Sequence, residues 1–202
     1  SAAELSKAAV TLSVEKDGQP ISSAVAVNAA PLIAPYCTRG YSYIEPITLV
    51  DFSDITNATP ATSAIANEDF TATVGNLLTG GDYQITVKGN TDGPYTAAIA
   101  LYIDWNQNDT FDAGEGYFVG TLTDSTGTDA KAATATISVP PTAQAGTTRM
   151  RVTKQYTTAN PAGLENAAAC GTTGYGQAED YTVDIEIDPN VPIPPSLDMA
   201  FA

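Results

Sequence analysis

Oxygen-bearing side chains recur at short intervals in the stretch DWNQNDTFDAGE, residues 104–115. Calcium prefers roughly six to eight hard oxygen ligands, and a tightly wound loop of about twelve residues supplies them from positions 1, 3, 5, 7, 9 and 12. These positions hold Asp104, Asn106, Asn108, Thr110, Asp112 and Glu115. The spacing predicts one bound calcium ion, with Thr110 contributing its carbonyl and Glu115 closing the loop as a bidentate ligand.

Two residues inside this loop bear on whether it can wind tightly. The sixth position, where the turn usually requires glycine, is Asp109. Aspartate is among the residues that tolerate a positive φ angle. The eighth position is Phe111, which we expect to anchor the loop to the core. An ordinary polar turn is the alternative interpretation, but it leaves Glu115 without a role.

The segments around the loop alternate apolar and polar residues with a period of two, which is typical of strands. AIALYID (98–104) precedes the loop and GYFVGTL (116–122) follows it. Similar runs occur at 10–14, 24–27, 47–50, 70–74, 83–89, 133–139, 148–154 and 180–187. Helix signals are brief, at 1–9 and 163–169. We therefore predict an all-β fold, an antiparallel β-sandwich or jelly roll, with the calcium loop between two strands.

The composition excludes several classes of function. With 23 acidic and 8 basic residues, the formal net charge is −15, which repels nucleic acids and anionic lipids. No apolar run approaches the ~20 residues that span a bilayer, so we expect no nucleic-acid partner and no membrane insertion. The chain lacks histidine, which excludes Ser-His-Asp and Cys-His catalysis and the usual histidine-bearing metal sites. We predict that the protein is not an enzyme.

Two arginines and two acidic residues lie in separate strand-like segments near the C-terminus. Arg149 and Arg151 belong to TRMRV, and Glu179 and Asp180 belong to a later acidic run. We predict structural ion pairs between these arginines and carboxylates across neighbouring strands. The alternative is that these carboxylates provide oxygen ligands for the calcium ion of the loop.

The two cysteines, Cys37 and Cys170, are far apart in the sequence. Neither a CxxC redox motif nor a four-ligand zinc cluster is therefore available. A long-range disulfide is the natural use of the pair, and two buried free thiols are the alternative. A disulfide indicates an oxidising setting, so we expect an extracellular or cell-surface protein. No signal peptide opens the chain, which favours a mature or trimmed secreted fragment.

Four segments together resemble one protein family. They are YCTRGYSYIEPITLVDFSDITNAT (36–59), ALYIDWNQNDTFDAGE (100–115), VPPTAQAGTTRMRV (139–152) and CGTTGYGQAEDYTVDI (170–185). Their order and spacing, over residues 36–187, are similar to the GEVED domain of secreted bacterial proteins, common in Bacteroidetes. The Gly-Glu-Val-Glu-Asp-Tyr motif of that family corresponds to residues 176–181, where Gln177 and Ala178 replace the first glutamate and the valine.

The resemblance implies a β-rich, non-catalytic module of multidomain exported proteins, beside metalloproteases, adhesion modules or sorting domains. It also implies that Cys37 pairs with Cys170. The domain organisation that we expect is a strand-rich N-terminal extension (1–35), a GEVED-like sandwich (36–187) and a proline-rich linker (188–202).

We therefore predict a calcium-stabilised structural or adhesive accessory unit, with calcium and another surface protein as partners. The alternative is a carbohydrate-binding module, because aromatic rings stack on the apolar faces of sugars. A simpler interpretation is that the aromatic residues of this chain are half-buried positions of the sheets. The aromatic residues on which such a module would draw are Tyr36, Tyr41, Tyr43, Tyr95, Tyr102, Trp105, Tyr117, Tyr156 and Tyr175.

A third possibility for the function concerns residues 1–35, whose two strand-like pieces are separated by KDGQP. We interpret this segment first as an added hairpin and second as the end of a preceding domain. The remaining interpretation is a strand donated to a neighbouring molecule in an extracellular assembly.

Overall fold

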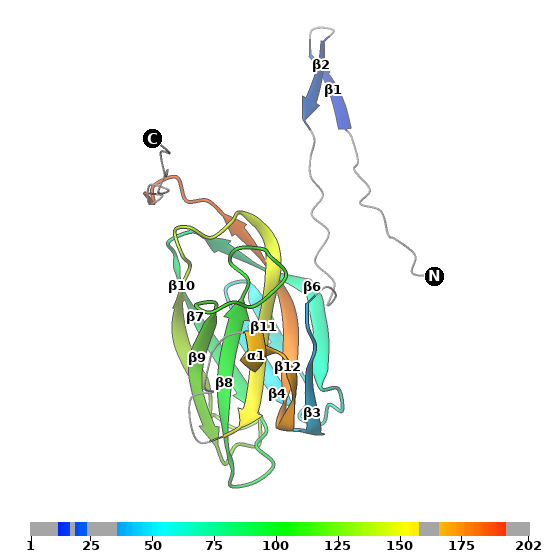
Figure 1. The fold of residues 1–202 in the computed structure, drawn as a ribbon, viewed down its shortest axis with the longest axis vertical. Coiled ribbons are helices and arrows are strands. Elements are labelled where there is room, and N and C mark those ends of the chain that lie inside the picture. The colour runs from blue at the N-terminus through cyan, green and yellow to red at the C-terminus, as the bar shows by residue number, and fades with distance from the viewer. Residues whose placement is uncertain (1–11, 17–18, 24–35, 158–165, 193–202) are drawn as a thin grey trace, which may run out of the picture.

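The computed structural model describes residues 12–16, 19–23, 36–157 and 166–192 (Figure 1). The strands are β1 Leu12–Lys16, β2 Gln19–Ser23, β3 Arg39–Ile44, β4 Ile47–Phe52, β5 Ile55–Ala58, β6 Asn67–Leu78, β7 Asp82–Gly89, β8 Thr96–Ile103, β9 Gly116–Thr123, β10 Ala133–Ser138, β11 Gly146–Tyr156 and β12 Gly171–Glu186. One short helix, α1 Asn166–Ala169, precedes β12. Among the described residues, no helix has the length and apolar character needed to cross a membrane.

Two sheets pack face to face as a sandwich, which confirms the predicted all-β fold (Figure 1). The first sheet has the strand order β10-β7-β4-β5 and is antiparallel throughout. The second has the order β3-β12-β11-β8-β9, and β6 also pairs with β12. Apolar side chains from both inner faces form one core, to which β8 contributes Ile99, Leu101 and Ile103.

The second sheet is mixed, because one of its strands has parallel as well as antiparallel neighbours. β12 is antiparallel to β11, but it is parallel to both β3 and β6. The first part of β12, from Gly171 to Gly176, pairs with β3, and the part from Ala178 to Glu186 pairs with β6. A period-two pattern identifies a strand but carries no information about the direction of its partner.

The strand boundaries follow the predicted pattern over most of the sandwich. β3 and β5 are not indicated by the sequence, because RGYSYI lacks a regular alternation and ITNA is very short. The helix signal at 163–169 contains α1. The predicted strand at 24–27 and the helix signal at 1–9 lie outside the described residues.

The N-terminal strands β1 and β2 form an antiparallel pair. Among the described strands, they pair only with each other. β2 begins at Gln19, inside the segment that the sequence suggests as a break.

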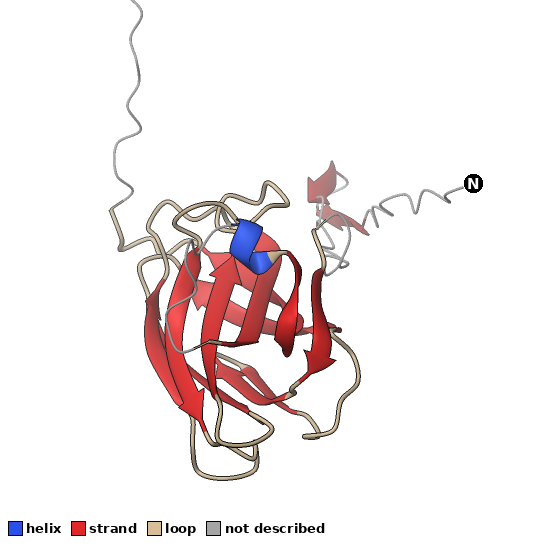
Figure 2. Cartoon of the chain, turned by 60° about the horizontal axis from the view of Figure 1, so that its bottom comes forward, coloured by secondary structure: helices blue, strands red, loops and turns tan. Residues whose placement is uncertain are grey.

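A second, smaller apolar cluster covers the outer face of the mixed sheet at one end. It contains Tyr36, Ala100, Tyr102, Phe111, Ala169 and Cys170. Figure 2 shows α1 lying against this face. The predicted loop and the two cysteines therefore meet over the same part of the sheet.

Candidate functional site

The predicted calcium loop connects β8 to β9 and winds as the sequence suggests. Asp109, at the sixth position, has a φ angle of 67°, so it adopts the left-handed conformation usually reserved for glycine. Phe111 is fully buried and packs against the rings of Tyr36 and Tyr102. The apolar eighth position therefore anchors the loop to the sheet.

Asp104, the first residue of the loop, is fully buried and its carboxylate has three donors. Its Oδ2 accepts hydrogen bonds from the hydroxyl of Tyr36 at 2.6 Å and from the backbone N–H of Asp109 at 2.9 Å. Its Oδ1 accepts from the backbone N–H of Asn108 at 3.2 Å. The carboxylate thus fixes the winding of the loop and joins it to the segment that precedes β3.

Glu115 closes the loop from the other end. Its Oε1 accepts from the backbone N–H of Trp105 at 2.9 Å, and its Oε2 accepts from the backbone N–H of Asp112 at 2.8 Å. Burial raises the pKa of Glu115, the N–H of Asp112 lowers it, and the neighbouring charge of Asp104 raises it further. Glu115 therefore has a structural role even without a bound ion.

The remaining predicted ligands form a compact polar group on the exposed side of the loop. The side-chain amides of Asn108 and Asn106 both donate to Oδ2 of Asp112, at 2.7 Å and 3.1 Å, and these bonds lower the pKa of Asp112. The hydroxyl of Thr110 donates to Oδ1 of Asn108 at 2.6 Å. Rotating an amide about its terminal bond exchanges nitrogen for oxygen, so both asparagines have an oxygen to offer a cation.

The donor set fits calcium by its chemistry. Three carboxylates, two amides and a threonine supply only oxygen, which suits a hard cation and does not suit a soft transition metal. Asp112 and Glu115 also accept hydrogen bonds from within the loop itself. In the described part of the chain, no three His, Cys, Asp or Glu side chains form a group that could hold a metal ion. A calcium site would therefore depend on the amide and carbonyl oxygens as well as the carboxylates.

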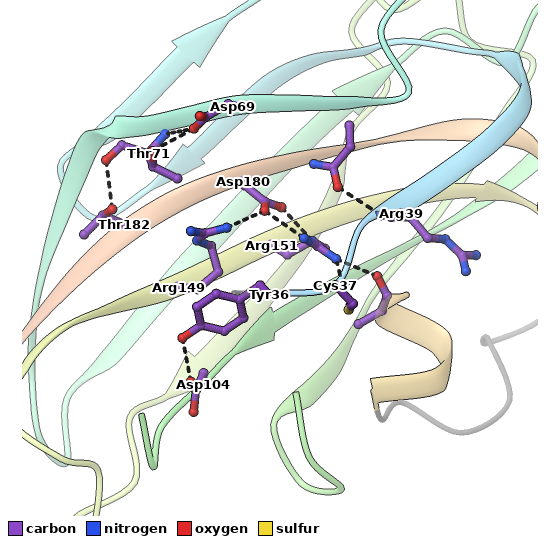
Figure 3. Close-up of polar contacts among 12 residues, drawn as sticks. Tyr36, Cys37, Arg39, Asp69, Thr71, Asp104, Arg149, Arg151, Asp180 and Thr182 are labelled. Carbon is purple, nitrogen blue, oxygen red and sulfur yellow. Dashed lines mark hydrogen bonds and ion pairs between the residues drawn. The ribbon is translucent and has the colours of Figure 1, made fainter. Parts of the chain in front are cut away.

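Next to the loop, two arginines share one carboxylate. Arg151 binds Asp180 in a bidentate manner, with Nε 2.6 Å from Oδ1 and Nη2 2.8 Å from Oδ2. Arg149 donates to Oδ2 of Asp180 from Nη1 at 2.7 Å. All three side chains are fully buried on the outer face of the sheet (Figure 3). The register explains this contact, because Arg151 lies directly opposite Asp180 in the β11–β12 pair.

Glu179 takes no part in this contact, so its predicted pairing with an arginine is wrong. Successive strand residues point to opposite faces, and Glu179 lies opposite Val152 of the inner core. Its Oε2 accepts a hydrogen bond from the hydroxyl of Tyr181 at 2.5 Å, and its Oε1 accepts one from the hydroxyl of Thr59 at 3.4 Å. Glu179 therefore belongs to the interior of the sandwich.

A second glutamate lies beside Glu179. Glu68 is its register partner in the parallel β6–β12 pair. Burial raises the pKa of Glu179 to about 7, the hydrogen bond from Tyr181 lowers it, and the charge of Glu68 raises it. Glu179 therefore holds its proton in the folded protein at a pH where an exposed glutamate has lost it.

This shift predicts that stability decreases as the pH rises. The folded protein binds one proton more than the unfolded chain between the ordinary pKa of 4.5 and about 7. The contribution of Glu179 to the free energy of unfolding should therefore fall by about 3 kcal/mol across this window. Urea unfolding at several pH values measures this decrease in the free energy of unfolding. Glu179→Gln should remove most of the decrease, whereas Glu186→Gln, at the exposed end of the same strand, should keep it. Equal slopes in both variants would contradict the assignment.

The predicted disulfide is present and joins the segment before β3 to the residue before β12. Cys37 and Cys170 are bonded, with their Cα atoms 5.7 Å apart, and neither cysteine is free. Nη1 of Arg151 donates to the backbone carbonyl of Ala169 at 3.0 Å, directly before Cys170. The disulfide therefore lies next to the buried ion pair.

Ring contacts connect the ion pair to the loop. The guanidinium of Arg149 lies 4.6 Å from the ring centroid of Tyr36, and that of Arg151 lies 5.3 Å from the ring centroid of Phe111. Because Tyr36 also donates to Asp104, the loop, the disulfide and the ion pair form one continuous cluster (Figure 3). We call it the outer-face cluster.

Sequence reasoning missed a second buried ion pair. Nζ of Lys154 lies 2.8 Å from Oε2 of Glu45, and both side chains are almost inaccessible to solvent. Burial lowers the pKa of Lys154, and the hydrogen bond that it donates to Glu45 raises it. These residues are far apart in the sequence, so no local spacing could have linked them.

The aromatic residues named as a possible sugar platform divide into two groups. Tyr36, Tyr41, Tyr102 and Trp105 are buried, and Tyr117 packs against Trp105. The first group serves the core, as the plainer interpretation of these residues predicts. The exposed group consists of Tyr43, Tyr95, Tyr156 and Tyr175.

The comparisons with known proteins agree with the family resemblance. Residues 98–184 match the family model of the GEVED domain, from within β8 to within β12. The match contains the loop, both arginines and the Glu179–Asp180 pair, and no curated protein matches the chain. Strands from residues before the match complete both sheets, so the folded unit extends beyond it. The chain therefore contains a GEVED domain.

Proposed function

We propose that this chain is a non-catalytic, calcium-stabilised extracellular module that serves as a structural or adhesive unit of a larger exported protein. The observation that carries the proposal is the loop between β8 and β9, where one tight turn gathers six oxygen-bearing residues at calcium-loop spacing. The ion would supply structural cross-linking of an irregular segment. Thr110 would hold it with its carbonyl, and the side-chain ligands would be Asp104, Asn106, Asn108, Asp112 and Glu115.

The outer-face cluster supports a structural role for this loop. Asp104 is joined through Tyr36 to the segment that carries Cys37, and Phe111 packs under the guanidinium of Arg151. An ion that rigidifies the loop would therefore also restrain the disulfide and the ion pair. The disulfide supports an exported setting, since such bonds persist in oxidising compartments.

The chemistry of the carboxylates supports a non-catalytic role. Asp104 is held by Tyr36 and backbone N–H groups, and Asp180 is held by two arginines. The chain has no histidine to act as a general base. These buried carboxylates are therefore committed to structural contacts.

Calcium should raise the melting temperature of the wild-type protein, and a chelator should lower it. A ligand that binds only the folded state stabilises it by about 2.7 kcal/mol at a hundredfold excess over Kd. Thermal melts in millimolar calcium and in chelator measure the shift, and calorimetric titration measures the affinity. Glu115→Gln should abolish most of the calcium-dependent shift because it removes the closing carboxylate.

The calcium-free melting temperature of this variant should also fall, because Glu115 accepts backbone hydrogen bonds at both ends of the loop. The difference between the two melts is therefore the informative quantity. Glu186→Gln, a matched change on the exposed end of β12, should leave that difference intact. Identical wild-type melts in calcium and in chelator, with no heat of binding, would show that the loop is an ordinary polar turn.

A further inference from the structure

Four exposed tyrosines form a continuous row across one end of the mixed sheet. Tyr43 lies in β3, Tyr175 in β12 and Tyr156 at the end of β11, while Tyr95 directly precedes β8. These strands are neighbours in that order, and each tyrosine is between 44% and 61% exposed. Consecutive ring centroids along the row lie 4.7, 6.0 and 5.9 Å apart.

The row borders a pocket that two carboxylates also line. Tyr95, Tyr156 and Tyr175 line a space of about 420 Å³ together with Glu45 and Asp92. This volume lies within the roughly 300 to 1,000 Å³ that ligand pockets occupy. Oε2 of Glu45 accepts from Lys154, and none of the hydrogen bonds among the described residues uses its Oε1. The pocket therefore combines aromatic side chains with two carboxylates, of which Asp92 is exposed and can accept a further hydrogen bond.

We propose that this pocket binds a neutral glycan. The C–H face of a sugar ring packs against aromatic faces, and its hydroxyls donate to carboxylate oxygens. Tyr156 stands at 69° to Tyr175 and at 82° to Tyr95, so the rings form a corner in which one sugar ring can pack. The exposed carboxylate of Asp92 would accept from the hydroxyls of that sugar, and the row would accommodate further sugar units.

Charge and ring orientation disfavour other small ligands. Glu45, Asp92 and the net charge of −15 repel anions. A methylated ammonium group is bound by rings whose faces converge on one point. Here Tyr43 and Tyr175 stack on each other with an interplanar angle of 14°, and the row extends over several strands. An extended neutral polymer matches this shape better than a compact cation.

The pocket and the calcium loop lie at opposite ends of β8. Tyr95 directly precedes this strand and Asp104 directly follows it. Glycan binding is therefore independent of the proposed calcium site, and the binding experiment is carried out both in calcium and in chelator.

Binding is tested on an array of neutral oligosaccharides and by affinity electrophoresis through gels that contain soluble neutral polysaccharides. The wild-type protein should bind at least one neutral glycan. Tyr156→Ala and Tyr175→Ala should each weaken that binding about tenfold, and Tyr156→Phe should retain it because the ring remains. Phe118→Ala, which removes an exposed ring of β9 outside the pocket, should bind as the wild type does.

Thermal melts establish that each variant is folded, and Tyr95→Ala replaces any variant that is not. The proposal is overturned if the wild-type protein binds no neutral glycan in either condition. It is also overturned if the tyrosine variants bind the glycan as well as the wild type does. Tetramethylammonium binding that requires the same tyrosines, without glycan binding, would assign the pocket to a cation instead.

Discussion

Replacing Cys37 and Cys170 together by serine is expected to lower the free energy of unfolding by about 5 kcal/mol. The bond closes a loop of 133 residues, and the chain-entropy estimate for a loop of that length has this size. The loss should be larger still if the segment before β3 detaches, because Tyr36 would then lose its hydrogen bond to Asp104. Urea unfolding of the oxidised wild type and the double variant measures the difference.

Reduction of the wild-type protein provides an independent control for this substitution. The reduced wild type should unfold at nearly the same urea concentration as the double variant, since both lack the same bond. Alkylation of the non-reduced protein under denaturing conditions should find no free thiol. Equal unfolding midpoints for the oxidised protein and the double variant would contradict the stabilising role of the bond.

Asp180→Asn should cost about 3 to 5 kcal/mol of stability. The substitution removes the carboxylate that receives both Arg149 and Arg151, while the two guanidinium groups stay buried. Removing one partner of a buried ion pair carries a cost of this size because the remaining charge has lost its compensation. The measurement is urea unfolding at neutral pH.

Asp184→Asn is the matched control, since it makes the same change on the same strand at a partly exposed position opposite Thr147. It should alter the free energy of unfolding by no more than about 0.5 kcal/mol. Replacing all three charged residues by apolar ones of similar size should restore much of the lost stability, because buried ion pairs offset a large desolvation cost. A loss below about 1 kcal/mol for Asp180→Asn would show that the cluster does not depend on this charge.

The features that the sequence predicted well are local ones. Six polar residues at calcium-loop spacing identified the turn between β8 and β9, because the spacing acts within one short segment. Alternation of apolar residues located most strands for the same reason. Alternation also places Glu179 and Asp180 on opposite faces of one strand, so only one of them could have reached the arginines.

The features that the sequence could not predict depend on which strands become neighbours. Lys154 and Glu45 meet only because β11 and the segment after β3 lie close together in the fold. The exposed tyrosine row requires the order β3-β12-β11-β8, which no periodicity specifies. The sequence alone therefore could not show that Tyr43 and Tyr156 are exposed while Tyr41 and Tyr102 are buried.

The double pairing of β12 bears on the order in which the chain can fold during synthesis. β3 and β6 are made early, yet their partner in the mixed sheet is the last strand of the sandwich. The backbone edge with which each of these two strands pairs to β12 therefore stays unpaired until residues 171–186 have been synthesised. Contacts so distant in sequence are slow to form, and unpaired strand edges promote aggregation. A chain that stops before β12 should consequently be prone to aggregate, although it contains most of the residues of the sandwich.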